Sequence, residues 1–281
     1  MYAQISNDVT DQALMGITIP PCPAVLTSIM REAKRPSADF ASISNLISRD
    51  AGIVGPLLKL ANSPFVGLKS KATSVFQAVS VLGMQNTVNL VQNIALRQSI
   101  GGASQSFEKF WERSSMSATV AEKVAAKFPS IAKDDAYIAA LFHDCGIPVL
   151  MMKYPDYRET LMEQCKQGRP ICDVENDSFS TSHTVVGNML TRSWMLPTHV
   201  CKAILYHHDS TVFNSSEEHH ENDICNLIGV VHMAERIVDE HLNMTSKEWH
   251  QFEEEVFKHF EMSAQEFFEP KQDVLAFLND E

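Results

Sequence analysis

The sequence of 281 residues predicts an all-α protein made of two helical bundles. Apolar residues recur every three to four positions through most of the chain, which is the period of an amphipathic helix. Strict alternation of apolar and polar residues, the pattern of a half-buried strand, does not extend over any useful length. Short stretches rich in proline, glycine or polar residues separate the periodic segments, as expected for helices joined by loops.

The first hundred residues contain five helical patterns. Pro20, Pro21 and Pro23 precede the first of them, and basic residues followed by Pro36 end it, which are start and stop signals of a helix. Residues 52–61 are apolar nearly all round, so we expect them at the centre of their bundle. Helices are predicted over residues 25–35, 39–48, 52–61, 75–82 and 84–98.

A domain boundary is predicted in the stretch 101–105, which is small, polar and aperiodic like a linker. Up to Ile100 basic residues outnumber acidic ones by 8 to 5, whereas from Phe213 onward acidic residues outnumber basic ones by 17 to 4. We therefore predict an N-terminal helical subdomain, residues 1–102, and a helical domain, residues 103–281, that ends in acidic helices. The acidic excess is either a solvated face or a docking surface for a basic partner.

The second domain contains eight further helical patterns. Between two of them, residues 209–222 are polar and lack a period, so we expect an exposed loop. Helices are predicted over residues 107–128, 134–152, 157–166, 182–194, 198–207, 223–241, 246–259 and 264–278.

Composition narrows the class of protein. The formal net charge of −12 argues against binding to nucleic acid or to an anionic membrane. The N-terminus lacks the basic and then apolar pattern of an export signal, and no stretch reaches the roughly 18 apolar residues of a spanning helix. Six scattered cysteines without a CxxC pair are expected to be reduced. These features predict a soluble cytoplasmic protein.

Polar groups interrupt one apolar helical run at His143 and Asp144. A buried imidazole and carboxylate need a metal ion, a counter-charge or hydrogen bonds, because burial without a partner costs several kcal/mol. Further candidates for a metal site lie on separate predicted helices, as in metal-binding helical bundles. They are His183, His207, His208, His232 and Glu235. Each of them could instead be an ordinary hydrogen-bonded residue, and His219 and His220 are most simply part of an exposed loop.

Nine motifs in order make the chain similar to the HDOD domain, the HD-related output domain of bacterial signalling proteins. They are residues 20–26 (PPCPAVL), 47–50 (ISRD), 57–64 (LLKLANSP), 78–83 (AVSVLG), 110–114 (FWERS), 140–146 (ALFHDCG), 183–187 (HTVVG), 194–197 (WMLP) and 204–208 (ILYHH). The resemblance spans about residues 17–238. It implies an HD-like fold for the second bundle, related to the HD and HD-GYP metal-dependent phosphohydrolases.

The resemblance assigns metal ligands to His143, Asp144, His183, and His207 or His208. The early histidine of the enzymes falls on Arg113, which cannot ligate because its guanidinium stays protonated. The late aspartate falls on Glu235, which still offers a carboxylate.

Two further parts of the phosphodiesterase machinery are missing from the sequence. Residues 145–148 read CGIP, with proline where those enzymes have lysine, and no Gly-Tyr-Pro signature occurs. The resemblance therefore implies a degenerate HD metal site.

We accordingly expect a regulatory signal-transduction module that acts by binding a signalling protein or a small ligand and is not an enzyme. In this interpretation Arg113 forms a buried ion pair with Asp144, and no cofactor is needed. Candidate surfaces are the corner at residues 62–64 and the cleft between the domains. Two interpretations of Phe267 and Phe268 are open. Their rings mediate homo-oligomerisation, or they pack on the core of the same chain.

Two alternatives remain open. The first is a metal-dependent phosphohydrolase that uses iron, manganese or zinc bound by the retained ligands. Those ligands are His143, Asp144, His183, His207, His208 and Glu235. The second is a protein that binds a metal ion without turnover.

Overall fold

The computed structural model describes residues 16–62, 71–100, 107–166, 168–214, 222–245 and 248–267. Within these ranges the chain forms fourteen α-helices, α2 to α15, and one short 3-10 helix, η3, with no β-strand. The prediction of an all-α fold is confirmed. The predicted loop at 209–222 contains η3, and its residues 215–221, including His219 and His220, lie outside the described ranges.

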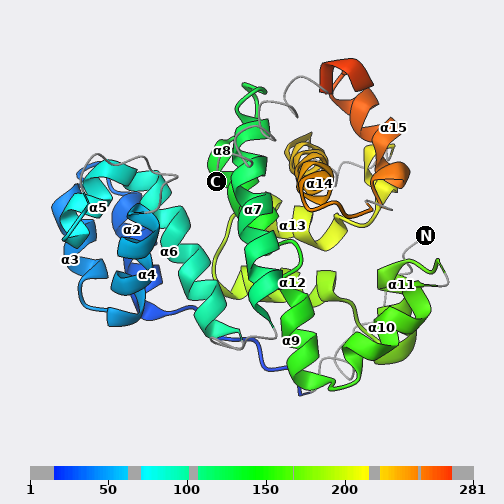
Figure 1. Ribbon diagram of the computed structural model, residues 1–281, viewed down its shortest axis with the longest axis horizontal. Helices are drawn as coiled ribbons and strands as arrows, with labels where there is room; N and C mark the ends of the chain where they lie inside the picture. Colours follow the sequence, from blue (N-terminus) through cyan, green and yellow to red (C-terminus); the bar gives the residue numbers. More distant parts are fainter. Residues whose placement is uncertain are drawn as a thin grey trace. The chain divides into compact units, whose positions relative to one another are not determined.

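The chain divides into two compact units (Figure 1). The smaller unit contains the described residues from Pro21 to Ile100, and the larger unit begins at Gln105. Residues 16–20 belong to the larger unit, where the indole of Trp194 donates a hydrogen bond to the Pro20 carbonyl at 2.9 Å.

Side-chain caps start three helices of the smaller unit. Asp39, Asp50 and Ser74 each accept a hydrogen bond from a backbone N–H in the first turn, which satisfies a donor that the helix itself leaves free. Gly83 joins α5 to α6 with a φ of +80°, a conformation that favours glycine. The helices of this unit are α2 (Ala24–Ala33), α3 (Phe40–Ile47), α4 (Ala51–Ala61), α5 (Val75–Leu82) and α6 (Met84–Ser99).

The corner at residues 62–64, a candidate surface in the sequence, begins with a structural residue. The Asn62 amide donates to the carbonyl of Ala72 at 2.9 Å and accepts from the N–H of Ala72 at 2.7 Å. Asn62 thereby ties the end of α4 to the segment before α5. Ser63 and Pro64 lie outside the described residues.

The larger unit packs around α7, α8 and α14, with α12 lying against both α9 and α13. Its helices are α7 (Glu108–Ala125), α8 (Lys133–Phe142), α9 (Gly146–Lys153), α10 (Tyr157–Cys165), α11 (Ile171–Phe179), α12 (His183–Ser193), α13 (Thr198–Tyr206), η3 (Ser210–Phe213), α14 (Asn222–His241) and α15 (Trp249–His259). Helix α11 is absent from the sequence prediction. Phe267 is buried and stacks on Trp249, which favours packing on the core, whereas Phe268 lies outside the described residues.

The helix predicted over residues 134–152 is wrong in one respect that matters for the site. The structure contains two helices there, α8 and α9, separated by His143, Asp144 and Cys145. Residues 133–153 are long and apolar enough to cross a membrane, but 72% of the apolar window is buried inside the protein. The stretch is therefore typical of a core segment of a helical bundle.

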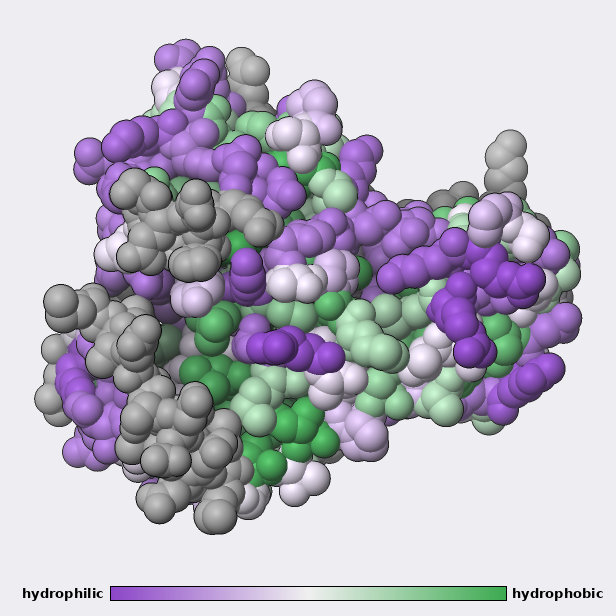
Figure 2. Space-filling view, turned by 180° about the vertical axis from the view of Figure 1, so that it is seen from behind, coloured by the Kyte–Doolittle hydropathy of each residue, from purple (hydrophilic) through white to green (hydrophobic). Residues whose placement is uncertain are grey.

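Large apolar side chains are also exposed in both units. On the face drawn in Figure 2, hydrophobic residues lie among hydrophilic ones. The large apolar side chains that are more than half exposed are Phe76, Met152, Met162, Met195 and Met244.

Candidate metal centre

The break between α8 and α9 places a carboxylate inside the larger unit. Cys145 N–H donates to the Phe142 carbonyl at 3.0 Å, and Ile147 N–H donates to the Asp144 carbonyl at 2.9 Å, so the turn keeps its backbone hydrogen bonds. Gly146 then begins α9 against the start of α12. A Cβ atom at Gly146 would lie 2.1 Å from the His183 carbonyl oxygen, so only glycine permits this approach.

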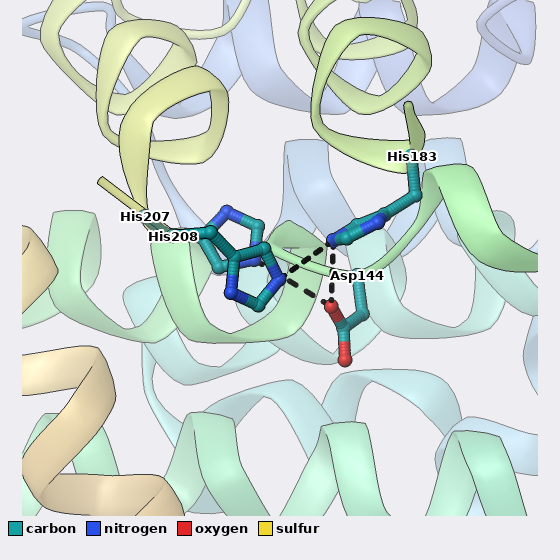
Figure 3. A group of neighbouring side chains, drawn as sticks. All are labelled: Asp144, His183, His207 and His208. Atoms are coloured by element: carbon teal, nitrogen blue, oxygen red, sulfur yellow. Dashed lines mark hydrogen bonds and ion pairs between the residues drawn. The ribbon is translucent and has the colours of Figure 1, made fainter. Parts of the chain in front are cut away.

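Four histidines, from the end of α8, the start of α12 and the end of α13, lie around Asp144. Nε2 of His183 and Nε2 of His207 lie 3.4 and 3.6 Å from Asp144 Oδ1, while Nε2 of His143 lies 3.1 Å from Asp144 Oδ2. Nε2 of His208 lies 2.9 Å from Nε2 of His183. Figure 3 shows three of these rings turned toward the carboxylate. The structure thus brings together the predicted His-Asp pair, His183 and both members of the adjacent histidine pair.

Two of these rings are held by backbone carbonyls. Nδ1 of His143 donates to the Ala140 carbonyl at 2.8 Å, and Nδ1 of His207 donates to the Ile204 carbonyl at 2.7 Å. A ring that is neutral and carries its hydrogen on Nδ1, as in His207, has its lone pair on Nε2, the atom that faces Asp144.

The other two rings are held by carboxylates. Nδ1 of His183 contacts Glu175 Oε2 at 2.7 Å, and Tyr157 donates a hydrogen bond to the other oxygen of Glu175. Nδ1 of His208 hydrogen-bonds Glu248. Histidines that ligate metals are commonly oriented in this way, by a carboxylate or carbonyl on the nitrogen that faces away from the ion.

Glu175, Tyr157 and Glu248 were not identified from the sequence. Glu175 is fully buried although it is ionisable, and it lies on the buried face of α11 with Cys172 and Phe179. These three residues are spaced three and four positions apart, as on one face of a helix. A charged residue within such an apolar face was the feature of the sequence that could have identified Glu175. It was missed because α11 was not predicted.

Burial and charge set the protonation of the cluster. Burial opposes ionisation of Asp144, but His143 and His207 hold the pKa of this carboxyl well below its usual value. Burial also opposes a charged His143 ring, yet Asp144 and Glu235 raise the pKa of His143 well above its usual value. Burial lowers the pKa of His207 to about 4 and that of His208 to about 3, and neighbouring imidazoles add to both shifts. At neutral pH, His207 and His208 are therefore neutral rings beside a carboxylate.

The residues fit a metal ion. Nε2 of His143 and Nε2 of His207 are buried without a hydrogen-bond partner in the part of the chain that the structure describes. The Nε2 atoms of His183 and His208 approach each other while both Nδ1 atoms face carboxylates, so a proton or a metal ion must occupy the space between their lone pairs. Asp144 and three of the histidines, His183, His207 and His208, offer ligand atoms within 4.8 Å of one another. Imidazole nitrogen and carboxylate oxygen suit iron, manganese and zinc.

Arg113 forms a different ion pair from the one predicted. Its guanidinium contacts Glu235 Oε1 at 2.8 Å and Asp239 Oδ1 at 2.9 Å, both on α14, instead of binding Asp144. The prediction failed because Asp144 is surrounded by imidazoles, whereas the two α14 carboxylates lie one helical turn apart and together match the fork of the guanidinium. Asp144 is only a weaker contributor to the raised pKa of Arg113.

Glu235, the predicted late ligand, lies beside His143 and does not belong to the ligand group of the three clustered rings. Its Oε1 is 3.3 Å from Nε2 of His143, and the two residues form a second possible ligand group with Asp144. The same oxygen binds Arg113, which already supplies a positive charge there.

An all-α bundle with an imidazole cluster around a His-Asp pair defines the HD-like class of helical proteins. A family model of the HDOD domain matches residues 19–210. The chain belongs to the HDOD family, as its sequence motifs predicted.

Solved structures share the fold at low sequence identity. A "Putative phosphohydrolase" from Shewanella amazonensis SB2B is similar with a TM-score of 0.73 and 17% identity, over 96% of this chain and 94% of that one. An HDOD domain protein with unknown function from Geobacter sulfurreducens has a TM-score of 0.71 and 19% identity, over 97% and 93% of the two chains. These likenesses establish the fold alone.

A curated relative extends beyond the length of this chain. An uncharacterized protein from Treponema pallidum (strain Nichols) is 27% identical over 193 residues. The match covers 68% of this chain but only 38% of the relative.

Proposed function

We propose that this protein is a regulatory HDOD module that holds one divalent metal ion in the Asp144 centre and signals by binding a partner, without hydrolysing a phosphoester. The observation that carries the proposal is the ion pair of Arg113 with Glu235 and Asp239. It supplies a guanidinium at the oxygen that a second ion beside His143 would need.

The retained half of the centre supports a bound ion. Asp144, His183, His207 and His208 would hold it, and each imidazole is already oriented through its Nδ1 atom. A divalent ion bound by such ligands polarises a phosphoryl oxygen and lowers the pKa of a bound water. In the regulatory function its contribution is structural, because it neutralises Asp144 and links α12 and the end of α13 to the α8–α9 turn.

The partner is proposed to be a signalling protein in the bacterial cytoplasm, reached through a surface or by association of two copies. The net charge of −12 supports a protein partner over nucleic acid or an anionic membrane. The six free cysteines support a reducing compartment.

The same four ligands favour a second candidate, a metal-dependent phosphohydrolase that works with a single ion. We therefore test the two functions together by measuring bound iron, manganese and zinc in untagged protein and its hydrolysis of bis-(p-nitrophenyl) phosphate. The regulatory function predicts that His183→Ala binds one metal ion per chain fewer than the wild type, and that the wild type shows no turnover above that of this variant. Turnover in the wild type that disappears in His183→Ala would instead establish the hydrolase.

The proposed role of Arg113 has its own test. Arg113→His removes the guanidinium and supplies an imidazole, so we expect it to bind one more ion per chain than the wild type. Arg236→His is the control for an added histidine, because Arg236 lies on α14 with Glu235 and Asp239 but is about one-third exposed and pairs with Glu240. An unchanged metal content in Arg113→His would show that Arg113 does not exclude an ion.

A further inference from the structure

A cavity of about 290 Å³ lies beside the metal centre, within the larger unit. It is bounded mainly by α14 and by the start of α15. The lining residues are Arg113, His232, Glu235, Asp239, Met244, Thr245, Glu248 and Trp249. Apart from the shared Glu235, none of them belongs to the ligand groups around Asp144.

His232 supplies a lone pair to this cavity. Its ring is 2% exposed, and Nε2 donates to the His207 carbonyl at 2.6 Å, which leaves the lone pair on Nδ1. The ring stacks on Phe252 with centroids 3.7 Å apart, so its plane is fixed. In the described residues Nδ1 has no hydrogen bond, and it faces Glu235 Oε2 at 3.9 Å.

Two carboxylates stand beside this lone pair. The two oxygens of Glu235 have different neighbours. Oε1 binds Arg113, and Oε2 faces Nδ1 of His232. Glu248 immediately precedes α15 and also hydrogen-bonds His208. The ligand atoms of His232, Glu235 and Glu248 lie within 4.8 Å of one another. A lone pair that faces two acceptors favours a cation, a proton or a donating water molecule between them.

The net charge of the lining residues favours a cation over an anion as the ligand of this cavity. Three carboxylates, those of Glu235, Asp239 and Glu248, and the single guanidinium of Arg113 leave two negative charges on the lining. An anion such as phosphate is repelled by this lining, whereas one divalent cation balances it. A nitrogen ligand with two carboxylates suits zinc, manganese, iron or cobalt better than calcium or magnesium.

We propose that the cavity binds a divalent transition-metal ion through Nδ1 of His232 and the carboxylates of Glu235 and Glu248, at a site separate from the Asp144 centre. In a tetrahedral site, metal–ligand bonds of about 2.0–2.2 Å place ligand atoms roughly 3.3–3.6 Å apart. Nδ1 of His232 and Oε2 of Glu235, at 3.9 Å, need to close by a few tenths of an ångström, and ligand atoms at the 4.8 Å limit of the group need to close by about one ångström. The site does not depend on the proposed regulatory function.

The test is Co²⁺ binding to metal-free protein, measured by calorimetry and by absorption of the bound ion. His232→Gln is the informative variant because the glutamine amide can still donate to the His207 carbonyl but offers no lone pair at the Nδ1 position. His183→Ala removes a ligand of the Asp144 centre only. Circular dichroism checks that each variant folds, and His232→Phe, which keeps a ring to stack on Phe252 but offers no nitrogen, replaces His232→Gln if that variant does not fold.

We expect two bound ions in the wild type and one ion fewer in His232→Gln, or an affinity at least tenfold weaker at one site. His183→Ala should lose the other ion. The proposal is overturned if His232→Gln binds Co²⁺ with the stoichiometry and affinity of the wild type, or if the wild type binds one ion that only His183→Ala removes. Loss of an ion in His232→Gln with no change in His183→Ala would overturn the Asp144 centre and leave the cavity site standing.

Discussion

Replacement of Arg113 by alanine should destabilise the larger unit much more than an exposed salt bridge would. Arg113 is 26% exposed at its side chain, and Glu235 and Asp239 are 13% and 9% exposed, so all three charges are largely removed from water. Its loss leaves two buried carboxylates one helical turn apart, Asp239 without its guanidinium partner and Glu235 with the His143 ring as its remaining neighbour of opposite charge. Breaking a buried pair of this kind costs about 3–5 kcal/mol.

The measurement is urea unfolding followed by tryptophan fluorescence. The three tryptophans, Trp111, Trp194 and Trp249, are all buried in the larger unit, so the signal reports this unit alone. Arg236→Ala is the matched control, because Arg236 pairs with Glu240 on the same helix at 3.1 Å but both side chains are about one-third exposed. We expect the control to lose about 0.3–0.5 kcal/mol. A loss below about 1 kcal/mol in Arg113→Ala would refute the buried ion pair.

The same comparison has a predicted pH dependence. His143 and Arg113 hold the pKa of Glu235 well below its usual value of 4.5, although burial opposes this shift. A carboxyl with a lowered pKa contributes stability that is complete above its unfolded pKa and is lost as the pH falls through its folded pKa. The difference between the wild type and Arg113→Ala should therefore be constant near neutrality and shrink below about pH 4.5.

Two further substitutions test how the centre is built. Glu175→Gln keeps the size of the side chain but removes the charge that orients His183, so we expect metal affinity to fall about 10–100-fold by calorimetry, while Asp173→Asn on the exposed face of α11 leaves it unchanged. Equal affinities in the two variants would show that Glu175 has no orienting role. Gly146→Ala should lose the metal and lower the melting temperature, because its Cβ would meet the His183 carbonyl at 2.1 Å. Wild-type metal content in this variant would contradict the required close approach.

The sequence predicted what local periodicity and motif order determine. Helical spacing sufficed for the all-α fold, and the motifs around His143, His183 and His207 sufficed for the HDOD family. The break at residues 143–145 was not predicted because the polar pair that interrupts the apolar run was interpreted as a metal site within one helix. The close approach of Gly146 to the His183 carbonyl is a tertiary contact, which no local pattern records.

The supporting residues of the centre were harder to predict than the histidines. Glu175 hydrogen-bonds a ring eight residues away and is itself held by Tyr157, on another helix. Glu248 reaches His208 across forty positions. Arg113 was assigned the wrong partner because alignment to a motif places a side chain near a site without deciding between neighbouring carboxylates.

The two oxygens of Asp144 explain why the centre should hold one ion and not two. On the Oδ1 side, imidazole nitrogens face the carboxylate and no Lys or Arg side chain bonds the group in the described chain. On the Oδ2 side, Glu235 is already neutralised by a guanidinium at 2.8 Å. Two unit charges about 4 Å apart repel by about 4 kcal/mol at an effective dielectric constant of 20, and a divalent ion doubles this cost. A second ion at Glu235 Oε1, beside His143, therefore meets several kcal/mol of repulsion that the first does not, whereas the ion proposed at Oε2 gains the carboxylate of Glu248 and the lone pair of His232. Two-metal hydrolysis requires both ions to clamp the attacking and leaving oxygens. In the proposed regulatory function, Arg113 would therefore remove that mechanism and leave the imidazole cluster intact.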